Sequence, residues 1–434
     1  MNQRYEAQAV ESPPAVSRVT ERIATKVEFG LNETTLVFLA VAVLVFSAVF
    51  WTANGRNLEK IDFSVTYLGA RIVHQGQGAN LYDLTEQVKL RSALYQHPNP
   101  LIYEHPPFEP LLLSPLAGLS YRSAYLIWGS INAMLWLVLP YVFRRYAAVP
   151  KDGPAYLALW FIFAPLGVAL YQGQSSIVLL LVYILTFISL KGSRDLLAGI
   201  FLGLGLFKFQ FVVPFALIFL LRKKWRFLAG FALSATVLGA LSLVAVGWQG
   251  MTSYVHLLLS IGSNPGNVSY GSAVDMPTLH GFVYALLSRI VGVRAISIVV
   301  AAISVLLILF TASRWEHAER TAGDNSFDLV FAAAVAMSLM TGLHMFTHDF
   351  SPLMLALLLV AAHFPSDGHP GLRWLLGITM ALFWFPPLYF ILVGRHGLYL
   401  MFPLLAVLWV VALKLSGIPD NSRLTSAATA RNEC

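Results

Sequence analysis

Long apolar runs recur along the chain, and short polar segments separate them. A transmembrane helix needs about 20 apolar residues, and fewer where a segment is re-entrant. We therefore expect an all-α, polytopic transmembrane helical bundle. The pattern predicts about twelve spans, at 34–53, 123–143, 156–171, 175–190, 196–207, 209–221, 226–247, 293–312, 328–344, 350–364, 373–391 and 398–414.

The apolar stretch 196–221 is unusual because Lys208 lies at its centre. It is too long for one ordinary span, and a basic cluster follows it at 222–226. We interpret it as two short helices with Lys208 at the turn. With the N-terminus in the cytoplasm, this hairpin places most of the 29 Lys and Arg residues in cytoplasmic segments, as the positive-inside rule requires. A single span would instead place the cluster at 222–226 outside.

Two long segments between the spans, 54–122 and 248–292, fall on the outer face in this topology. The first contains helical, amphipathic stretches around 63–73 and 85–96, so we expect interfacial helices that lie along the membrane. The predicted organisation is a cytoplasmic N-terminal tail at 1–32, a single integral membrane catalytic domain at 33–415, and a cytoplasmic C-terminal tail at 416–434.

Composition excludes a soluble protein and weakens several other classes. Hydrophobic residues make up 57% of the chain and charged residues only 12%, whereas about a quarter of an ordinary soluble domain is charged. The net charge of +7 sits in short loops, which is a membrane topology signal rather than a nucleic-acid interface. The single cysteine, Cys434, excludes an intrachain disulfide. No phosphate-binding glycine loop or DxD pair occurs at a plausible place, so we expect no soluble nucleotide ligand and no cofactor.

Polar residues from distant segments converge on the outer rim in this topology, and Asp62 is the strongest functional candidate among them. It follows the first predicted span and has apolar neighbours, Ile61 and Phe63. A carboxylate in such a place can have a raised pKa and act as a general base. The alternative is that Asp62 caps the helix that begins at Phe63. From the spacing alone, the two interpretations are about equally supported.

Three other segments offer polar groups at the same rim. Tyr103 and Glu104 precede a Pro-Pro junction and are candidate substrate contacts. Gln174 follows Gly173 in a short turn that the glutamine itself does not require, so it is a candidate ligand for sugar hydroxyls. Lys208, with Gln210 beside it, interrupts apolar sequence. Ionisable residues in membrane segments are functional candidates, although a lysine at a hairpin tip can also reach water by extending its stem.

The segment from His344 to Asp349 joins two predicted spans. His344 and His348 are four residues apart, so one helical turn aligns them. A metal site is the lesser interpretation, because the HExxH pattern is absent and no fourth ligand is evident. A pairing of His348 and Asp349 that binds phosphate or hydroxyl groups is better supported.

These motifs, taken in order with the loop lengths between them, resemble those of a known family over roughly residues 35–410. The matching residues are Asp62, Phe63, Tyr67, Ala70, Gly78, Leu81, Tyr82, Asp83, Tyr103, Pro106, Pro107, Phe108, Leu111, Leu112, Pro115, Leu116, Ala117, Gly173, Gln174, Gly203, Lys208, Gln210, His348 and Asp349. The chain resembles glycosyltransferase family 87, a polytopic family of the GT-C class that includes actinobacterial polyprenol-phosphate-mannose-dependent α-1,2-mannosyltransferases. It departs from the usual pattern at Ser175, where Asn is common, and at Phe211, where Pro is common.

The resemblance implies an inverting, metal-independent transfer of a sugar, in this case mannose. The implied donor is a polyprenyl-phosphate sugar, and the implied acceptor is a glycolipid or glycan at the outer face of a bacterial inner membrane. Both termini would be cytoplasmic. Asp62 would be the base, and Lys208 and His348 would stabilise the lipid phosphate. Asp349, Gln174, Gln210, Tyr103, Glu104, Tyr67 and His344 are the other candidate binding residues.

Two further classes fit parts of the pattern. A lipid or lipid-linked-sugar transporter or flippase would explain the broken stretch 196–221, because transporters carry polar residues on interrupted helices. Against it, the other polar groups lie at one rim and no inverted repeat is evident. A scaffold subunit without chemistry is less favoured, because the segment 54–122 is rich in polar and aromatic residues.

Overall fold

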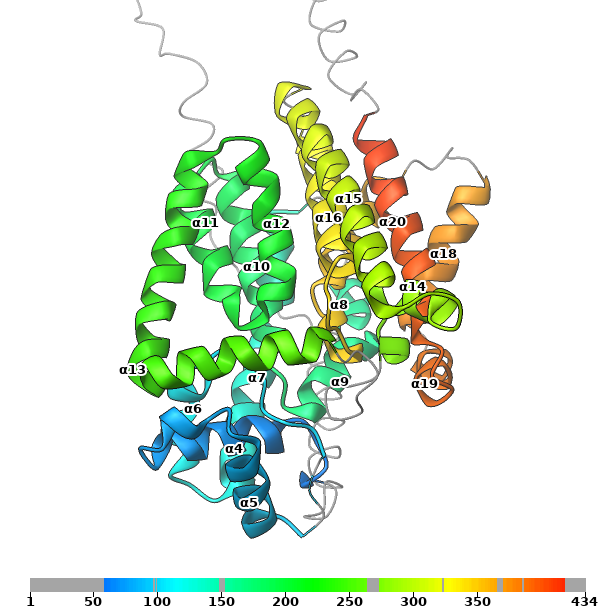
Figure 1. Cartoon of the computed structure of the whole chain (residues 1–434). Helices are drawn as coiled ribbons and strands as arrows, with labels where there is room; N and C mark the ends of the chain where they lie inside the picture. Colours follow the sequence, from blue (N-terminus) through cyan, green and yellow to red (C-terminus); the bar gives the residue numbers. More distant parts are fainter. Residues whose placement is uncertain are drawn as a thin grey trace, which may run out of the picture.

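The computed structural model describes residues 58–96, 98, 100–147, 153–263, 273–321, 324–364, 370–384 and 386–417. Every regular element among these residues is a helix, as predicted (Figure 1). The predicted first span at 34–53, the N-terminal tail and nearly all of the C-terminal tail lie outside the described residues.

The helices predicted within the first long loop are present and lie together at one end of the molecule, where Figure 1 shows them in blue. Asp83 starts one of them, because its side chain accepts hydrogen bonds from the backbone N–H groups of Thr85 and Glu86 and so satisfies donors that a helix leaves unpaired. These elements are α4 (Phe63–His74), η1 (Gly78–Asn80), α5 (Leu84–Leu94) and α6 (Phe108–Ala117).

The middle of the chain alternates long and short apolar helices. The predicted span 156–171 divides at Phe163, because its extended backbone and Pro165 behind it begin a new helix. The elements are α7 (Tyr121–Phe143), α8 (Gly153–Ile162), α9 (Ala164–Gln172), α10 (Ser176–Lys191), α11 (Asp195–Leu204), η2 (Gly205–Lys208) and α12 (Phe209–Leu221).

The stretch Asp195–Leu221 is long and apolar enough to count as one span, but its packing brings the chain back on itself. Phe227 at the start of the next helix touches both ends. A Cβ atom at Gly199 would lie 1.9 Å from the carbonyl oxygen of Phe227, and the Phe219 ring stacks on the Phe227 ring with centroids 3.8 Å apart. We therefore describe α11 and α12 as a hairpin with Lys208 at its tip. Each arm is also too short for a hydrocarbon core of about 30 Å.

The next helix, α13 (Trp225–Ser263), bends at Gly247, where φ is 64° and ψ is −177°. That backbone conformation is open to glycine at little cost. The first part ends where the predicted span 226–247 ends, and the second part runs across the molecule between α10–α12 and α4–α6 in Figure 1. The predicted loop 248–292 thus begins with a helix and also holds η4 (Ala273–Asp275) and α14 (Leu279–Leu287).

The C-terminal third packs around two central helices, whose side chains are almost entirely buried in protein. Leu329–Met340 in α16 and Leu353–Val360 in α17 provide most of this interior. The elements are α15 (Val293–Thr321), α16 (Asp324–Met340), η5 (Thr347–Phe350), α17 (Leu353–Ala362), α18 (Pro370–Trp384), α19 (Pro386–Gly394), η6 (Leu398–Leu400) and α20 (Met401–Ser416).

The predicted count of twelve spans is not confirmed. Among the described residues, five helices are long and apolar enough to cross a membrane, or six if the pair α18 and α19, bent by 73°, is one span. Helices α6, α10 and α16 are apolar but have only 10 to 17 residues. Burial inside protein makes a helix as apolar as contact with lipid does, so hydropathy alone does not separate spans from buried helices here.

Candidate active site

The glycine turn between α9 and α10 packs against the start of α4. Gly173 has φ of 65°, and a Cβ atom there would lie 2.7 Å from the Cβ of Phe63. On either side of it, Gln172 Oε1 accepts a hydrogen bond from the Asp62 backbone N–H at 3.0 Å, and Gln174 Nε2 donates to Asp62 Oδ2 at 2.9 Å. The glutamine proposed from sequence as a sugar ligand therefore holds Asp62.

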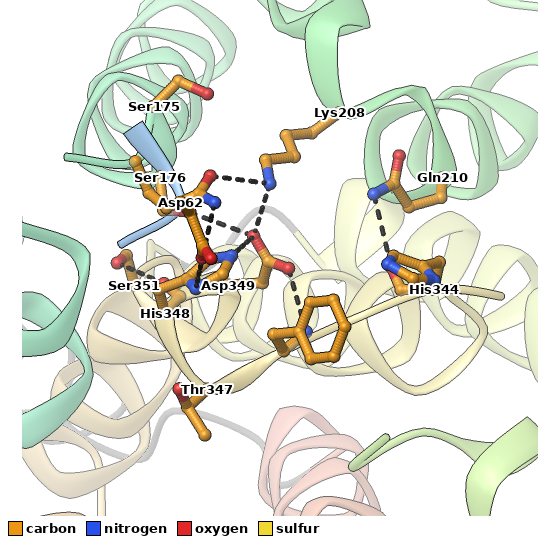
Figure 2. A network of polar contacts seen from close by, with 12 residues as sticks. Asp62, Ser175, Ser176, Lys208, Gln210, His344, Thr347, His348, Asp349 and Ser351 are labelled. Carbon is orange, nitrogen blue, oxygen red and sulfur yellow. Dashed lines mark hydrogen bonds and ion pairs between the residues drawn. The ribbon is translucent and has the colours of Figure 1, made fainter. Parts of the chain in front are cut away.

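The carboxylate of Asp62 turns toward this polar cluster rather than toward its own helix. Asp62 occupies the N-cap position of α4, but its side chain makes no capping hydrogen bond. The capping alternative is therefore wrong in this structure. Asp62 Oδ2 lies 3.6 Å from His348 Nδ1, and the Asp62 side chain is 19% exposed (Figure 2).

Lys208 and Asp349 form a buried ion pair at the centre of the cluster. Lys208 Nζ lies 3.0 Å from Asp349 Oδ1 and donates to Gln174 Oε1 at 3.4 Å. Lysine is seldom buried without a partner, because the charged form loses its hydration. The tip of the α11–α12 hairpin thus places a cation beside the base candidate (Figure 2).

Asp349 is held on both carboxylate oxygens. Oδ1 also accepts from Ser176 Oγ at 3.0 Å, and Oδ2 accepts from the Phe346 backbone N–H at 3.0 Å. Burial alone would raise the pKa of Asp349, but the charge of Lys208 and the hydrogen bonds from Phe346 and Lys208 outweigh it and hold the pKa below its usual range. Asp349 is therefore suited to be a permanent counterion and is a poor base.

His348 lies between two carboxylates. Its Nδ1 faces Asp62, and its Nε2 is 3.5 Å from Asp349 Oδ1. Burial lowers the pKa of His348 below its usual value despite these two neighbours. A neutral imidazole can donate from one nitrogen and accept at the other, so His348 can orient Asp62 without placing a second fixed positive charge there.

His344 is directed elsewhere. Its Nε2 lies 3.1 Å from Glu104 Oε1, and Gln210 Nε2 donates to the backbone oxygen of His344 at 3.3 Å. The segment between His344 and His348 is not a helical turn, so the predicted alignment of the two histidines does not occur. In the part of the chain that is described, no group of three or more His, Cys, Asp or Glu residues has the geometry of a metal site.

Tyr103 and Tyr67, both candidate binding residues, make contacts within the protein. Tyr103 is fully buried, and its backbone N–H donates to Gln87 Oε1 at 2.8 Å. The Tyr67 hydroxyl donates to the backbone oxygen of Leu119 at 2.7 Å. Neither side chain has a hydrogen bond to Asp62, Lys208 or Asp349 among the described contacts.

A second buried pair behind the cluster was missed in the sequence. Glu109 is 7% exposed and accepts from the Ser175 hydroxyl at 3.2 Å, from the Tyr103 hydroxyl at 3.3 Å and from His105 Nδ1. Ser175 occupies the N-cap position of α10 but makes no capping bond there. The signal that identifies the pair is the spacing of His105 and Glu109, four residues apart at the start of a helix.

An apolar cavity of about 250 Å³ adjoins these groups. The two residues that follow His105 line it, as do Leu206 and Phe209 on either side of Lys208. Met251 and Tyr254, from the second part of α13, close another side. The cavity is therefore lined by chain neighbours of His105 and Lys208, but not by the side chains of those two residues themselves.

A model of glycosyltransferase family 87 matches residues 103–342, which is more than half of the chain. This range includes Lys208, Gln174 and Glu109, while Asp62 lies 41 residues before it and His348 lies six residues after it. No curated protein and no solved structure matches the chain. Because the match covers more than half of the sequence, the chain belongs to glycosyltransferase family 87.

Proposed function

We propose that this membrane glycosyltransferase moves a sugar, mannose by resemblance, from a polyprenyl-phosphate donor to a glycolipid or glycan acceptor. The proposed site is at the outer face of a bacterial inner membrane, with both termini in the cytoplasm. The family match favours transfer over the transporter or flippase alternative. Within the family, the lipid donor is supported by the apolar cavity that Leu206 and Phe209, chain neighbours of Lys208, help to line.

The observation that carries the proposal is the orientation of Asp62. Gln172 accepts from its backbone N–H, while Gln174 donates to its carboxylate and His348 faces it, so the carboxylate points away from the helix it precedes and remains partly exposed. In the reaction, an acceptor hydroxyl oxygen bonds to the anomeric carbon of the sugar, and Asp62 takes the hydroxyl proton. The bond between that carbon and the phosphate oxygen breaks, and its electron pair stays on the phosphate. Attack from the opposite face inverts the anomeric centre.

The departing lipid phosphate needs hydrogen-bond donors. Lys208 has three N–H bonds, of which two are directed to Asp349 and Gln174. The third is a candidate contact for the phosphate, because donors already fixed in place stabilise developing charge without reorganising. The apolar cavity next to Lys208 would take the first part of the polyprenyl chain.

The donor class is tested with purified protein in bilayers. Polyprenyl-phosphate mannose and GDP-mannose are each supplied with a crude glycolipid extract, and labelled product is counted. We expect transfer from the lipid-linked sugar only, with a product whose anomeric configuration is opposite to that of the donor. Transfer from GDP-mannose alone would overturn the proposed donor.

A further inference from the structure

His105 is a more accessible cationic candidate than the two buried basic residues of the cluster, Lys208 and His348. Its side chain is 22% exposed, compared with 5% for Lys208 and 2% for His348. The Tyr82 hydroxyl donates to the backbone oxygen of His105 at 2.7 Å. Two prolines follow it, which restrict the backbone further. His105 therefore has a fixed position but retains access to a ligand.

Glu109 determines which nitrogen of His105 is available. His105 Nδ1 is bonded to Glu109 Oε2, and the Glu109 carboxylate is fixed in turn by Ser175 and Tyr103. No hydrogen bond of His105 Nε2 is found among the described residues. Because Nδ1 is committed to the carboxylate, any ligand of the imidazole is bound through Nε2.

The surroundings of His105 favour an anion that carries an apolar chain. The two prolines after it line the apolar cavity, and its charge interacts with those of Lys208 and His348. The positive charge of Lys208 is already balanced by Asp349. The Lys208–Asp349 pair has no net charge, so a phosphate that binds here gains little electrostatic attraction from Lys208. The phosphate therefore needs a second hydrogen-bond donor that points at it.

We propose that His105, oriented by Glu109, donates a hydrogen bond from Nε2 to the phosphate of the lipid donor. This inference rests on the proposed function and adds a phosphate-binding residue to it. Glu109 is a positioning residue, because it acts through His105. No bond is made or broken by His105, whose proton stays on the imidazole.

The protonation of His105 predicts the direction in which phosphate binding changes with pH. Burial would lower its pKa, but Glu109 outweighs burial and raises it above the usual value. Phosphate binding should therefore be strongest below that raised pKa and weaken as the pH rises through it. The other titratable groups that face the pair are Glu104, Lys208, His348, Tyr82, Tyr103 and Tyr254.

The test measures binding of farnesyl methyl phosphate to the detergent-purified full chain across the range in which histidine titrates. This diester carries one negative charge throughout, so any pH dependence comes from the protein. We expect His105→Gln to weaken binding about tenfold at the acidic end, as loss of a hydrogen bond to a charged group does, and to flatten the pH profile. Glu109→Gln should move the fall in affinity to lower pH while keeping wild-type affinity at the acidic end.

Thermal unfolding of each variant serves as the folding control, and His396→Gln, an exposed histidine paired with Asp275, is the matched variant that should bind normally. Should His105→Gln fail to fold, the shifted profile of Glu109→Gln decides the question. If both variants bind with wild-type affinity and unchanged pH profiles, the role of His105 is overturned and the proposed donor is left intact. If the wild-type protein does not bind farnesyl methyl phosphate, the proposed lipid-phosphate donor is overturned as well.

Discussion

At the scale of single residues, Lys208 illustrates how a buried partner changes the expected effect of a substitution. From the sequence alone, Lys208→Met removes one charge-assisted contact and keeps the fold. In the structure the same change leaves Asp349, only 1% exposed, without its cation. Removing one member of a buried ion pair costs about 3–5 kcal/mol.

We therefore expect Lys208→Met to lower the thermal unfolding temperature as well as transfer. The double variant Lys208→Met with Asp349→Asn removes both charges, so it should recover most of the stability while transfer stays low. Unfolding in detergent and transfer of labelled sugar are measured on the same preparations. Full recovery of transfer in the double variant would show that Lys208 acts only as the partner of Asp349.

Some site residues could be found in the sequence, and others could not. Asp62 and Lys208 are recognisable because each is a polar group in an apolar context. Ser176 and Asp349 form a hydrogen bond although 173 positions separate them, and no local pattern encodes such a contact. The Glu109–His105 pair shows the intermediate case, since its helical spacing is visible but its burial is not.

At the scale of elements, the turn between α9 and α10 controls the position of Asp62. Gly173→Ala combines a left-handed φ with a contact of 2.7 Å to Phe63. We expect it to displace both glutamines from Asp62 and to lower the rate of transfer at least about tenfold. A factor of about ten corresponds to the free energy of strain that such a backbone position typically carries. Gly167→Ala in α9 is the matched control, because a Cβ atom there meets nothing within 4 Å.

The control should keep full activity, and its added helix propensity is worth up to about 1 kcal/mol. Transfer rates and unfolding temperatures of both variants provide the comparison. Normal transfer by Gly173→Ala would mean that Asp62 does not depend on this turn.

The elements that sequence predicted well are those marked by local chemistry. The break at Lys208 and the bend at Gly247 both coincide with residues that interrupt a helix or an apolar run. The count of spans is not confirmed, and it is hardest to judge where helices are surrounded by protein. Val330 in α16 and Leu357 in α17 are 1% and 0% exposed, and such helices have the hydropathy of a span without its length.

At the scale of the whole molecule, the hairpin fixes which segments face the same side. The turn that contains Ser193 precedes α11, and Lys223 follows α12, so both should face the cytoplasm. Gln75, at the end of α4, should face outward. After Cys434→Ser, single cysteines at these three positions are labelled with a membrane-impermeant maleimide in intact and opened cells.

We expect label at position 75 in intact cells, and at positions 193 and 223 only after opening. Labelling of 193 and 223 from opposite sides would make 195–221 a single crossing and would separate Lys208 from the proposed outer site.

The central claim is that the Asp62 carboxylate is the base of a transfer reaction. The most direct measurement compares transfer by wild type and Asp62→Asn at equal donor occupancy, with binding of the donor lipid measured separately. Asparagine keeps the shape and accepts the hydrogen bond from Gln174, but it cannot take a proton, so we expect intact binding and a rate about a hundred- to ten-thousand-fold lower. Near-normal transfer by Asp62→Asn would contradict the account and direct attention to Glu104, another partly exposed carboxylate at this rim.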